Sequence, residues 1–139
     1  MNPIKEDSFG VVPLKQVGDV WMVFVILHKQ GRHWGFPKGK RQGEEDAKAS
    51  AVRELKEETN LDVVRFLQEA PLVESYLFSK RGKKVLKTVH YFPAVVSGEE
   101  KLQPEEIRDG KWLPLLEAHA QLSFKEARSI CDYVIHLLK

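Results

Sequence analysis

The first part of the chain has the hydrophobic pattern of two neighbouring β-strands. Residues 8–15 and 20–28 are rich in β-branched and aromatic side chains and are separated by a turn-like link. This pattern predicts a hairpin. In the second run both alternating sets of positions are apolar, which predicts a central strand covered on both faces. Pro13 predicts that the first strand ends or bulges there, and the polar residues 1–7 predict a loose end.

A helix is predicted over residues 46–60, after a glycine-rich loop. Asp46 is a suitable N-cap, and Asn60 suits the left-handed conformation in which many helices end. Apolar side chains at helical spacing form a stripe that should face the core: Ala47, Ala51 and Leu55. We therefore expect this segment to pack one face on the rest of the fold.

Two further strands are predicted after that helix. Residues 62–79 and 85–97 have strand composition and are joined by a turn at 80–84. Pro71 interrupts the first of them, which predicts that it is divided into two pieces. In the second strand, alternation places three side chains on one side: Lys87, Val89 and Tyr91.

The last part of the chain predicts mostly helix. After a loop at 98–110 we expect a short strand at 110–113 and a helical turn at 114–120. Ser123 and Glu126 have the spacing of a capping box before a final helix. The buried stripe of that helix is predicted to be Phe124, Ala127, Ile130, Cys131, Val134 and Leu138.

This succession of strands and helices predicts an α/β fold with a mixed sheet and helices packed on it. The pattern is compatible with a βαβ crossover around the helix at 46–60, but it does not fix the order of the strands. The 139 residues suit a single domain, residues 1–139, with no internal repeat or linker. A chain of this length can bury a core without disulfides.

Composition narrows the possible partners. The chain has 42% hydrophobic and 30% charged residues and a formal net charge of +2, so it is less basic than most nucleic-acid-binding domains. Its charges gather in a basic and an acidic cluster, for which solvated loops are the simplest interpretation. The clusters are Lys80, Arg81, Lys83, Lys84 and Lys87, and Glu99, Glu100, Glu105, Glu106 and Asp109.

The sequence also indicates a location. No apolar run approaches membrane-spanning length, and the first ten residues lack the apolar core of a signal peptide. Cys131 is the single cysteine, so the chain forms no internal disulfide, which fits a reducing compartment. We therefore expect a cytoplasmic monomer with no membrane partner.

Three glutamates in the predicted helix point to chemistry. Glu54, Glu57 and Glu58 lie three and four residues apart or side by side, so their carboxylates share one helix face. Like charges this close repel each other, and a hard divalent cation would reverse the sign of that interaction. Ligands that are all oxygen suit Mg²⁺, which proteins commonly hold with a few carboxylates plus substrate phosphates. The hypothesis is a magnesium-binding helix that acts on a phosphate chain.

The glutamates belong to a longer motif. It reads Gly39, five residues, Glu45, seven residues, and then Arg-Glu-Leu-Lys-Glu-Glu-Thr-Asn-Leu at 53–61. This resembles the Nudix box, whose second half is Arg-Glu-aliphatic-any-Glu-Glu-any-Gly-aliphatic. The one departure is Asn60 in place of the last glycine, and asparagine also adopts the left-handed conformation. The departure therefore leaves the carboxylates untouched.

The resemblance implies a Nudix α/β/α sandwich with a mixed β-sheet between helices. Nudix enzymes hydrolyse a nucleoside diphosphate linked to another group, with Mg²⁺ or Mn²⁺. Phosphoanhydride hydrolysis needs neutralised oxygens and a water molecule in line, and a carboxylate-bound metal supplies both. By this resemblance the metal ligands are the Gly39 carbonyl, Glu54, Glu57 and Glu58.

Two further box residues have implied supporting roles. Arg53 would orient a helix glutamate, and Glu45 would brace Arg53. Glu57 is the residue that we expect to be essential, while the general base stays open among Glu57, Glu58 and Glu106.

Residues outside the box resemble diadenosine tetraphosphate hydrolases, which split their substrate asymmetrically into ATP and AMP. The similar stretches are residues 34–39, residues 87–92, Glu106 with Trp112–Leu113, and residues 124–126. The resemblance thus runs from about residue 8 to the last helix. It implies that Glu106 binds a metal or serves as the base; the alternative is a solvated loop charge.

The same resemblance implies substrate contacts. Lys87 would contact phosphate, unless it is an ordinary strand-edge lysine. Tyr91 would stack on an adenine, unless it is a core residue. Phe124 would be a second stacking wall, or the first residue of the buried helix stripe.

Three residues of the glycine-rich loop complete the implied site. His33 would shape the loop, and Lys38 would reach phosphate. The family often has histidine where this chain has Lys40. A cation near phosphate therefore remains, but an imidazole for proton transfer does not.

Two alternatives stay open. One is a Nudix hydrolase of another substrate: an RNA 5′ end, an oxidised nucleotide or a diphosphoinositol phosphate. In that case an RNA 5′ end would be the only nucleic-acid partner. In the main hypothesis the substrate is a small molecule, a dinucleoside polyphosphate. The other alternative is a module that senses a nucleotide without cleaving it. The presence of Glu54, Glu57 and Glu58 argues against such a module.

Overall fold

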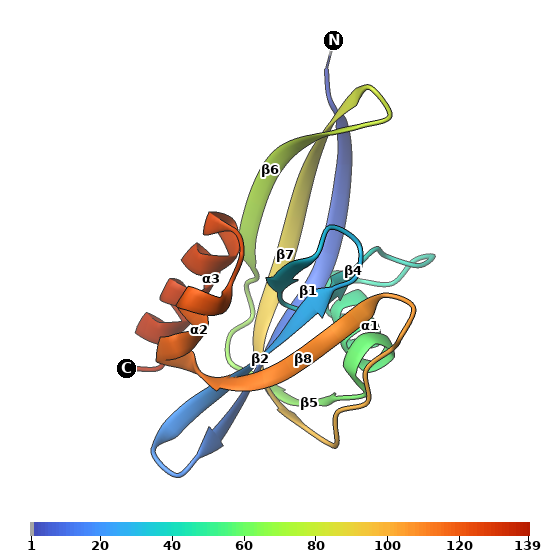
Figure 1. Ribbon diagram of the computed structural model, residues 1–139. Helices are drawn as coiled ribbons and strands as arrows, with labels where there is room; N and C mark the ends of the chain where they lie inside the picture. Colours follow the sequence, from blue (N-terminus) through green and yellow to red (C-terminus); the bar gives the residue numbers. More distant parts are fainter. Residues whose placement is uncertain (1) are drawn as a thin grey trace.

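The computed structural model describes residues 2–139 and contains one mixed sheet with helices on both faces (Figure 1). The strands are β1 (Ile4–Val17), β2 (Val20–His28), β3 (His33–Gly35), β4 (Lys38–Gly39), β5 (Asp62–Phe66), β6 (Leu72–Lys80), β7 (Lys83–Ser97) and β8 (Ile107–Pro114). The helices are α1 (Ala47–Thr59), α2 (Leu115–Gln121) and α3 (Lys125–Leu137).

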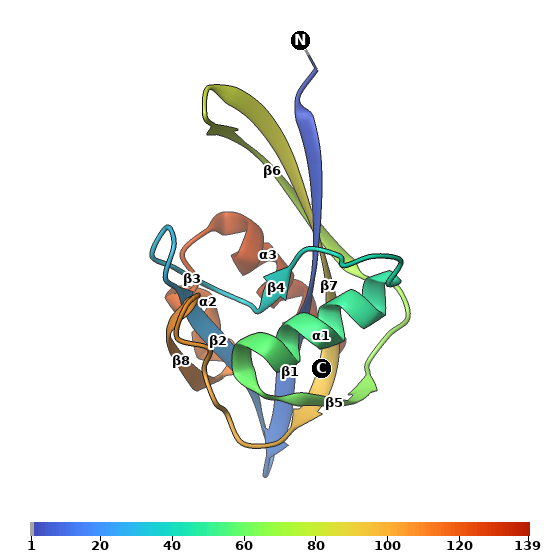
Figure 2. The same cartoon turned by 90° about the vertical axis from the view of Figure 1, so that its right-hand side faces the viewer.

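The sheet is built around β1 and β7, which are parallel to each other, while every other strand pairing is antiparallel. Its main order is β3-β2-β1-β7-β5; β4 also pairs with β1, β6 with β7, and β8 with β2. Helix α1 covers one face and helices α2 and α3 cover the other (Figures 1 and 2). The expected α/β/α sandwich with a mixed sheet is therefore confirmed.

Each face of the sheet has its own hydrophobic core. In β2, Val23 and Val25 pack in the core beneath α2 and α3, whereas Phe24 and Ile26 pack in the core beneath α1. All four are buried because successive strand residues point to opposite faces. This confirms that residues 20–28 form a central strand, and β2 indeed pairs with three strands.

Strand β1 differs from its prediction at two places. The polar residues from Ile4 to Asp7 are not a loose end, because they pair in register with β7; Met1 lies outside the described residues. Pro13 neither ends nor bulges the strand. Val11 donates its N–H to Pro37, on the edge away from β7, so the nitrogen of Pro13 faces the same edge. Strand β2 pairs with β1 only from Leu14 onward, so the absence of an N–H at Pro13 leaves no hydrogen bond of the sheet unmade.

Helix α1 has the ends that the sequence predicted. The side chain of Asp46 accepts a hydrogen bond from the N–H of Ala49 at 2.8 Å and caps the first turn. Asn60 ends the helix in the left-handed conformation, with φ of 67°, and its N–H donates to the carbonyl of Lys56. The apolar stripe predicted at residues 47–55 faces the sheet, with Ala51 and Leu55 fully buried.

The strands after α1 lie where they were predicted, but the loops that connect them are shorter than predicted. The stretch around Pro71 does separate β5 from β6, but the turn between β6 and β7 consists only of Arg81 and Gly82. The predicted loop at 98–110 is also too long, because β8 already begins at Ile107 and pairs with β2 there. The predicted helical turn at 114–120 is α2.

The start of the last helix corrects the predicted capping box. The N-cap is Phe124, and no side chain caps the helix. Ser123 instead accepts a hydrogen bond from the N–H of Trp34 at 2.8 Å and so ties this corner to β3. Phe124 is consequently outside the buried stripe, whose remaining members pack in the core: Ala127, Ile130, Cys131 and Val134 fully, and Leu138 in part. Within residues 2–139, no helix is long and apolar enough to cross a membrane.

The cap at Asp46 gives a first prediction. Replacing Asp46 by alanine removes the acceptor for the Ala49 N–H and should lower the free energy of unfolding by about 1 kcal/mol. Urea unfolding followed by circular dichroism measures the change. Asp46→Asn should restore most of the loss, because an asparagine side chain also caps; equal stability of the alanine variant and the unchanged protein would contradict the assignment.

Candidate active site

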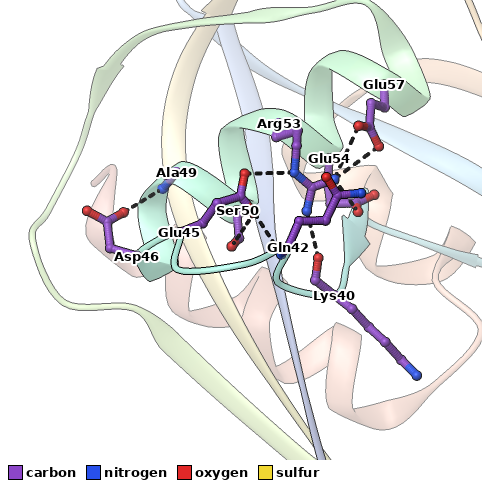
Figure 3. A network of polar contacts seen from close by, with 9 residues as sticks. All are labelled: Lys40, Gln42, Glu45, Asp46, Ala49, Ser50, Arg53, Glu54 and Glu57. Atoms are coloured by element: carbon purple, nitrogen blue, oxygen red, sulfur yellow. Dashed lines mark hydrogen bonds and ion pairs between the residues drawn. The ribbon is translucent and has the colours of Figure 1, made fainter.

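Arg53 connects helix α1 to the loop before it (Figure 3). Its Nε donates to Glu45 Oε2 at 2.8 Å, and its Nη1 donates to Glu54 at 3.0 Å and to Glu57 at 3.1 Å. Its Nη2 donates to the carbonyl of Lys40 at 2.7 Å. One guanidinium therefore holds two helix glutamates and the loop backbone in a fixed relation, because its donors form a rigid fork.

Glu45 is the brace on the other side of Arg53. It accepts hydrogen bonds from Arg53, from the N–H of Gln42 at 2.9 Å and from the Ser50 hydroxyl at 3.0 Å. The bond from Arg53, followed by that from Gln42, lowers the pKa of Glu45 to about 2. Glu45 therefore stays ionised and keeps Arg53 paired.

Three carboxylates gather at one end of a large cavity: Glu54 and Glu58 from α1, and Glu106 from the residue before β8. Glu58 is only 3% exposed and accepts the N–H of Lys38 at 3.0 Å. Burial, and then the charge of Glu54, raises the pKa of Glu58 to about 9. Burial also raises the pKa of Glu54, in spite of its contact with Arg53. The negative charge at this end thus exceeds what neighbouring groups balance.

Glu106 is held by its backbone. Its N–H donates to the side chain of Gln103 at 2.8 Å, and its carbonyl accepts from the N–H of Lys29 at the same distance. The interpretation of Glu106 as a solvated loop charge is therefore too simple, because its side chain borders the cavity beside the helix glutamates.

Gly39 allows Glu54 to lie against the backbone of β4. A Cβ atom at position 39 would lie 2.0 Å from Glu54 Cδ, inside the contact distance of any real atom pair. Gly39 is fixed in turn by pairing with Phe9 of β1. The glycine of the motif thus has a steric reason to be there, because any side chain would displace the carboxylate.

The predicted metal ligands are brought together only in part. Glu54, Glu58, Glu106 and Gly39 border the same cavity, whereas Glu57, with its side chain 51% exposed, contacts Arg53 and does not line the cavity. Within residues 2–139, no three acidic, histidine or cysteine side chains already converge closely enough to hold an ion. The donor atoms of these residues are nevertheless all oxygen, which suits Mg²⁺. The missing side chain of Gly39 also leaves room for the carboxylate of Glu54.

The predicted phosphate-contacting lysines lie across the cavity, which has a volume of about 1270 Å³. Lys87 and Lys40 both approach Glu6, with Nζ–Oε1 distances of 3.6 and 3.7 Å. Lys38 donates to the hydroxyl of Tyr76 at 3.2 Å. Burial, together with the charge of Lys38, lowers the pKa of Lys87. The same cavity is therefore bordered by both carboxylates and ammonium groups.

The structure does not support a stacking role for Tyr91. Its side chain is 2% exposed and meets the ring of Phe36 edge-on, with 5.6 Å between the centroids. Tyr91 borders the cavity, but its side chain is almost completely buried in the core that α3 covers, which favours the core interpretation.

Exposed aromatic rings lie elsewhere on the cavity wall. Phe124 is 52% exposed, and its ring lies 5.1 Å from that of His33, which stacks on His28 at 4.5 Å. Burial, as the largest cause, lowers the pKa of His33 to about 4 and of His28 to about 3, so both imidazoles are neutral at pH 7. Tyr76 borders the cavity on the side of β6.

Sequence reasoning missed several residues of the cavity wall, among them His28, Glu74 and Tyr76. Burial raises the pKa of Glu74 to about 7, and its Oε2 has no hydrogen-bond partner within residues 2–139. Tyr76 was missed because the turn after β6 is shorter than the turn predicted from the sequence. A two-residue turn at 81–82 sets the register that pairs Tyr76 with Lys87 and so puts both on the same face.

Comparison with known proteins finds relatives of this chain in sequence and in fold. Over 108 residues the chain is 30% identical to a Mycobacterium tuberculosis protein that carries the mutator-protein name MutT4; this covers 76% of the chain but only 42% of that protein. It is 26% identical over 121 residues to the asymmetrical bis(5′-nucleosyl)-tetraphosphatase of Caenorhabditis elegans, covering 86% of each. The crystal structure of the C. elegans Ap4A hydrolase has the same fold, with a TM-score of 0.74, 22% identity and coverage of 98% of this chain and 100% of that one.

The family follows from a match over most of the chain. The NUDIX domain family matches residues 5–133, a range that contains the Arg53 network and the carboxylates of the cavity. The chain therefore belongs to the NUDIX family of hydrolases.

Proposed function

We propose that this Nudix hydrolase cleaves dinucleoside polyphosphates, converting diadenosine tetraphosphate and water into ATP and AMP with Mg²⁺. The observation that carries the proposal is one cavity bordered by carboxylates at Glu54, Glu58 and Glu106, by lysines and by the exposed ring of Phe124. Such a cavity suits a phosphate chain that ends in a base. The 86% mutual coverage with an asymmetrical tetraphosphatase supports this substrate over shorter ones.

The roles of the residues follow from their places. Lys38, Lys40 and Lys87 bind phosphate oxygens as point charges. Arg53, braced by Glu45, positions the glutamates of α1. The Gly39 carbonyl with Glu54, Glu57, Glu58 and Glu106 would hold the metal. Bound Mg²⁺ would neutralise phosphate oxygens and make water a better nucleophile.

Proton removal from the attacking water is assigned to a carboxylate of the same group: Glu57, Glu58 or Glu106. The base of the nucleotide is assigned to the exposed ring of Phe124 and the partly buried ring of Tyr76, in place of the buried Tyr91. Phe124 is supported by its contact with His33, which holds the ring at the edge of the cavity. Tyr76 is supported by its hydrogen bond with Lys38, which places a ring next to a predicted phosphate contact.

Product analysis tests the proposal. The purified protein is incubated with diadenosine tetraphosphate and Mg²⁺, and the nucleotides are separated by ion-exchange chromatography. We expect ATP and AMP in equal amounts, and no ADP, because the cleavage is asymmetric. Slow turnover of this substrate beside fast turnover of triphosphorylated RNA ends would contradict the proposal.

A second candidate is hydrolysis of another nucleoside diphosphate derivative, such as an oxidised nucleotide. It is favoured by the 30% identity to the mutator protein. A substrate panel measured at equal enzyme concentration separates the two by kcat/KM. Binding without turnover of any member would instead indicate a nucleotide-sensing module.

A further inference from the structure

Strands β6 and β7 form a long hairpin that extends away from the helices together with the first residues of β1 (Figures 1 and 2). We call this three-stranded extension the arm; it comprises residues 4–8, 72–80 and 83–89. At its tip, Arg81 and Gly82 have φ of 52° and 78°. Two positive φ values are typical of the two-residue turns that join twisted strands directly. The arm therefore has a defined register up to its tip.

One face of the arm looks into the cavity. Residues directly opposite each other in paired strands point to the same face, so Tyr76 shares its face with Lys87, and Lys80 shares its face with Lys83. Phe78 lies between Tyr76 and Lys80 in the same alternating set. Residues 76–80 of β6, from both alternating sets, border the cavity together with Lys87 of β7. The cavity thus continues from the carboxylates of α1 along this face toward the tip.

The end of that face near the tip has free aromatic and positive groups. Phe78 is 36% exposed, and its ring lies 6.0 Å from that of Tyr76 with a tilt of 40°. Neither Lys80 nor Lys83 forms an ion pair within residues 2–139. Glu6 is the acidic residue of β1 on this face, and it is already shared by Lys40 and Lys87. An anion with an aromatic group would satisfy this combination.

We infer that the face formed by Phe78, Lys80 and Lys83 binds the second nucleoside of a dinucleotide and the phosphate next to it. The inference rests on the proposed function and adds a binding site at the far end of the cavity. Lys80 lies about 13 Å along β6 from Tyr76, at the usual rise per strand residue. The cavity volume of about 1270 Å³ also exceeds the roughly 300–1,000 Å³ of common small-molecule sites. One nucleoside binds near Phe124 and the other on the arm.

Binding measurements with two matched probes test this site. The probes are methylene-bridged, nonhydrolysable analogues of diadenosine tetraphosphate and of adenosine 5′-tetraphosphate, which differ by one nucleoside. Isothermal titration calorimetry with Mg²⁺ present should show that Phe78→Ala lowers the affinity for the dinucleotide analogue about tenfold. This is the usual effect of losing the stacking of one base. Lys80→Ala should also lower the affinity for the dinucleotide analogue. Phe78→Ala should not change the affinity for the single-nucleoside probe, whereas Lys80→Ala should weaken the binding of that probe as well, because the probe keeps the phosphate that Lys80 contacts.

The same hairpin offers two control variants. Val73 and Lys84 are exposed, and their strand partners, His90 and Ser79, place them on the opposite face. Val73→Ala and Lys84→Ala should leave both affinities unchanged. The inference is overturned if Phe78→Ala weakens neither probe or both equally, or if the controls weaken the dinucleotide as much. Unchanged single-nucleoside binding by Phe78→Ala and by the two controls also shows that these variants are folded.

Turnover by the unchanged protein separates this inference from the proposed function. If the protein binds the dinucleotide through Phe78 but yields no ATP and AMP, the proposed reaction fails and the arm site stands. If ATP and AMP form while Phe78→Ala keeps full affinity for the dinucleotide, the arm site fails and the proposed function stands.

Discussion

Replacing Glu58 by glutamine is expected to lower kcat for diadenosine tetraphosphate about a thousandfold, since metal-borne stabilisation of phosphate charge is worth several kcal/mol. Glutamine keeps the volume of the side chain and an oxygen for the N–H of Lys38, but it removes the buried negative charge. The variant should therefore stay folded. We would measure kcat at saturating Mg²⁺ and the unfolding temperature in EDTA.

The unfolding temperature makes the Glu58 prediction independent of activity. Without metal, the pKa of about 9 keeps Glu58 protonated at neutral pH, so the equally neutral glutamine should let the variant unfold at no lower temperature than the unchanged protein. Glu117→Gln, an exposed carboxylate on α2, is the matched control and should change neither quantity. Turnover by Glu58→Gln within about threefold of normal would show that the buried carboxylate is not part of the site, because the loss of a metal ligand has a far larger effect.

Glu57 provides an informative comparison. Its carboxylate contacts Arg53 and is half exposed, in contrast to that of Glu58. If Glu57 joins the metal site as the motif implies, Glu57→Gln will lose turnover as severely as Glu58→Gln. A mild loss would limit its role to positioning Arg53.

Gly39→Ala is expected to lower kcat/KM about a hundredfold, because misplacing a catalytic group by about 1 Å has an effect of this size. The added methyl group would overlap the carboxylate of Glu54, which is the flexible end of its side chain. The carboxylate should move away while the backbone stays in place. Activity should therefore fall far more than stability, which thermal unfolding measures.

A double-variant comparison identifies the cause of the Gly39 effect. Residues in contact do not act additively, so the change in unfolding temperature caused by Gly39→Ala should disappear in a Glu54→Ala background, where the methyl group meets no carboxylate. An equal change in both backgrounds would mean that residue 39 acts through something other than Glu54.

Helix α1 could be predicted almost completely from the sequence. Its N-cap at Asp46, its left-handed end at Asn60 and its buried stripe all depend on residues within a few positions of one another. Hydrogen bonds and side-chain spacing over such short distances are set by the helix itself. For the same reason the motif placed Arg53 next to Glu57, one helical turn away.

The substrate side of the cavity could not be predicted in the same way. Tyr91 and Tyr76 are both aromatic strand residues that border the cavity, and only the packing around them decides that the first is buried while the second is partly exposed. Phe124 has the spacing of a buried stripe, but the helix begins one residue later than the capping pattern indicated, and the ring remains exposed. Exposure depends on which elements cover a position, and that is a long-range property.

The sequence by itself determined helix α1, the glutamates on it and the family, because the motif is local and its spacing is characteristic. The tertiary structure alone decided which of these groups meet. It brings Glu106 from the edge of β8 to Glu54 and Glu58, and it turns the arm so that Phe78 and Lys80 face the same cavity. These contacts join residues far apart in the chain, and they follow from strand register and from the layer that covers each face of the sheet.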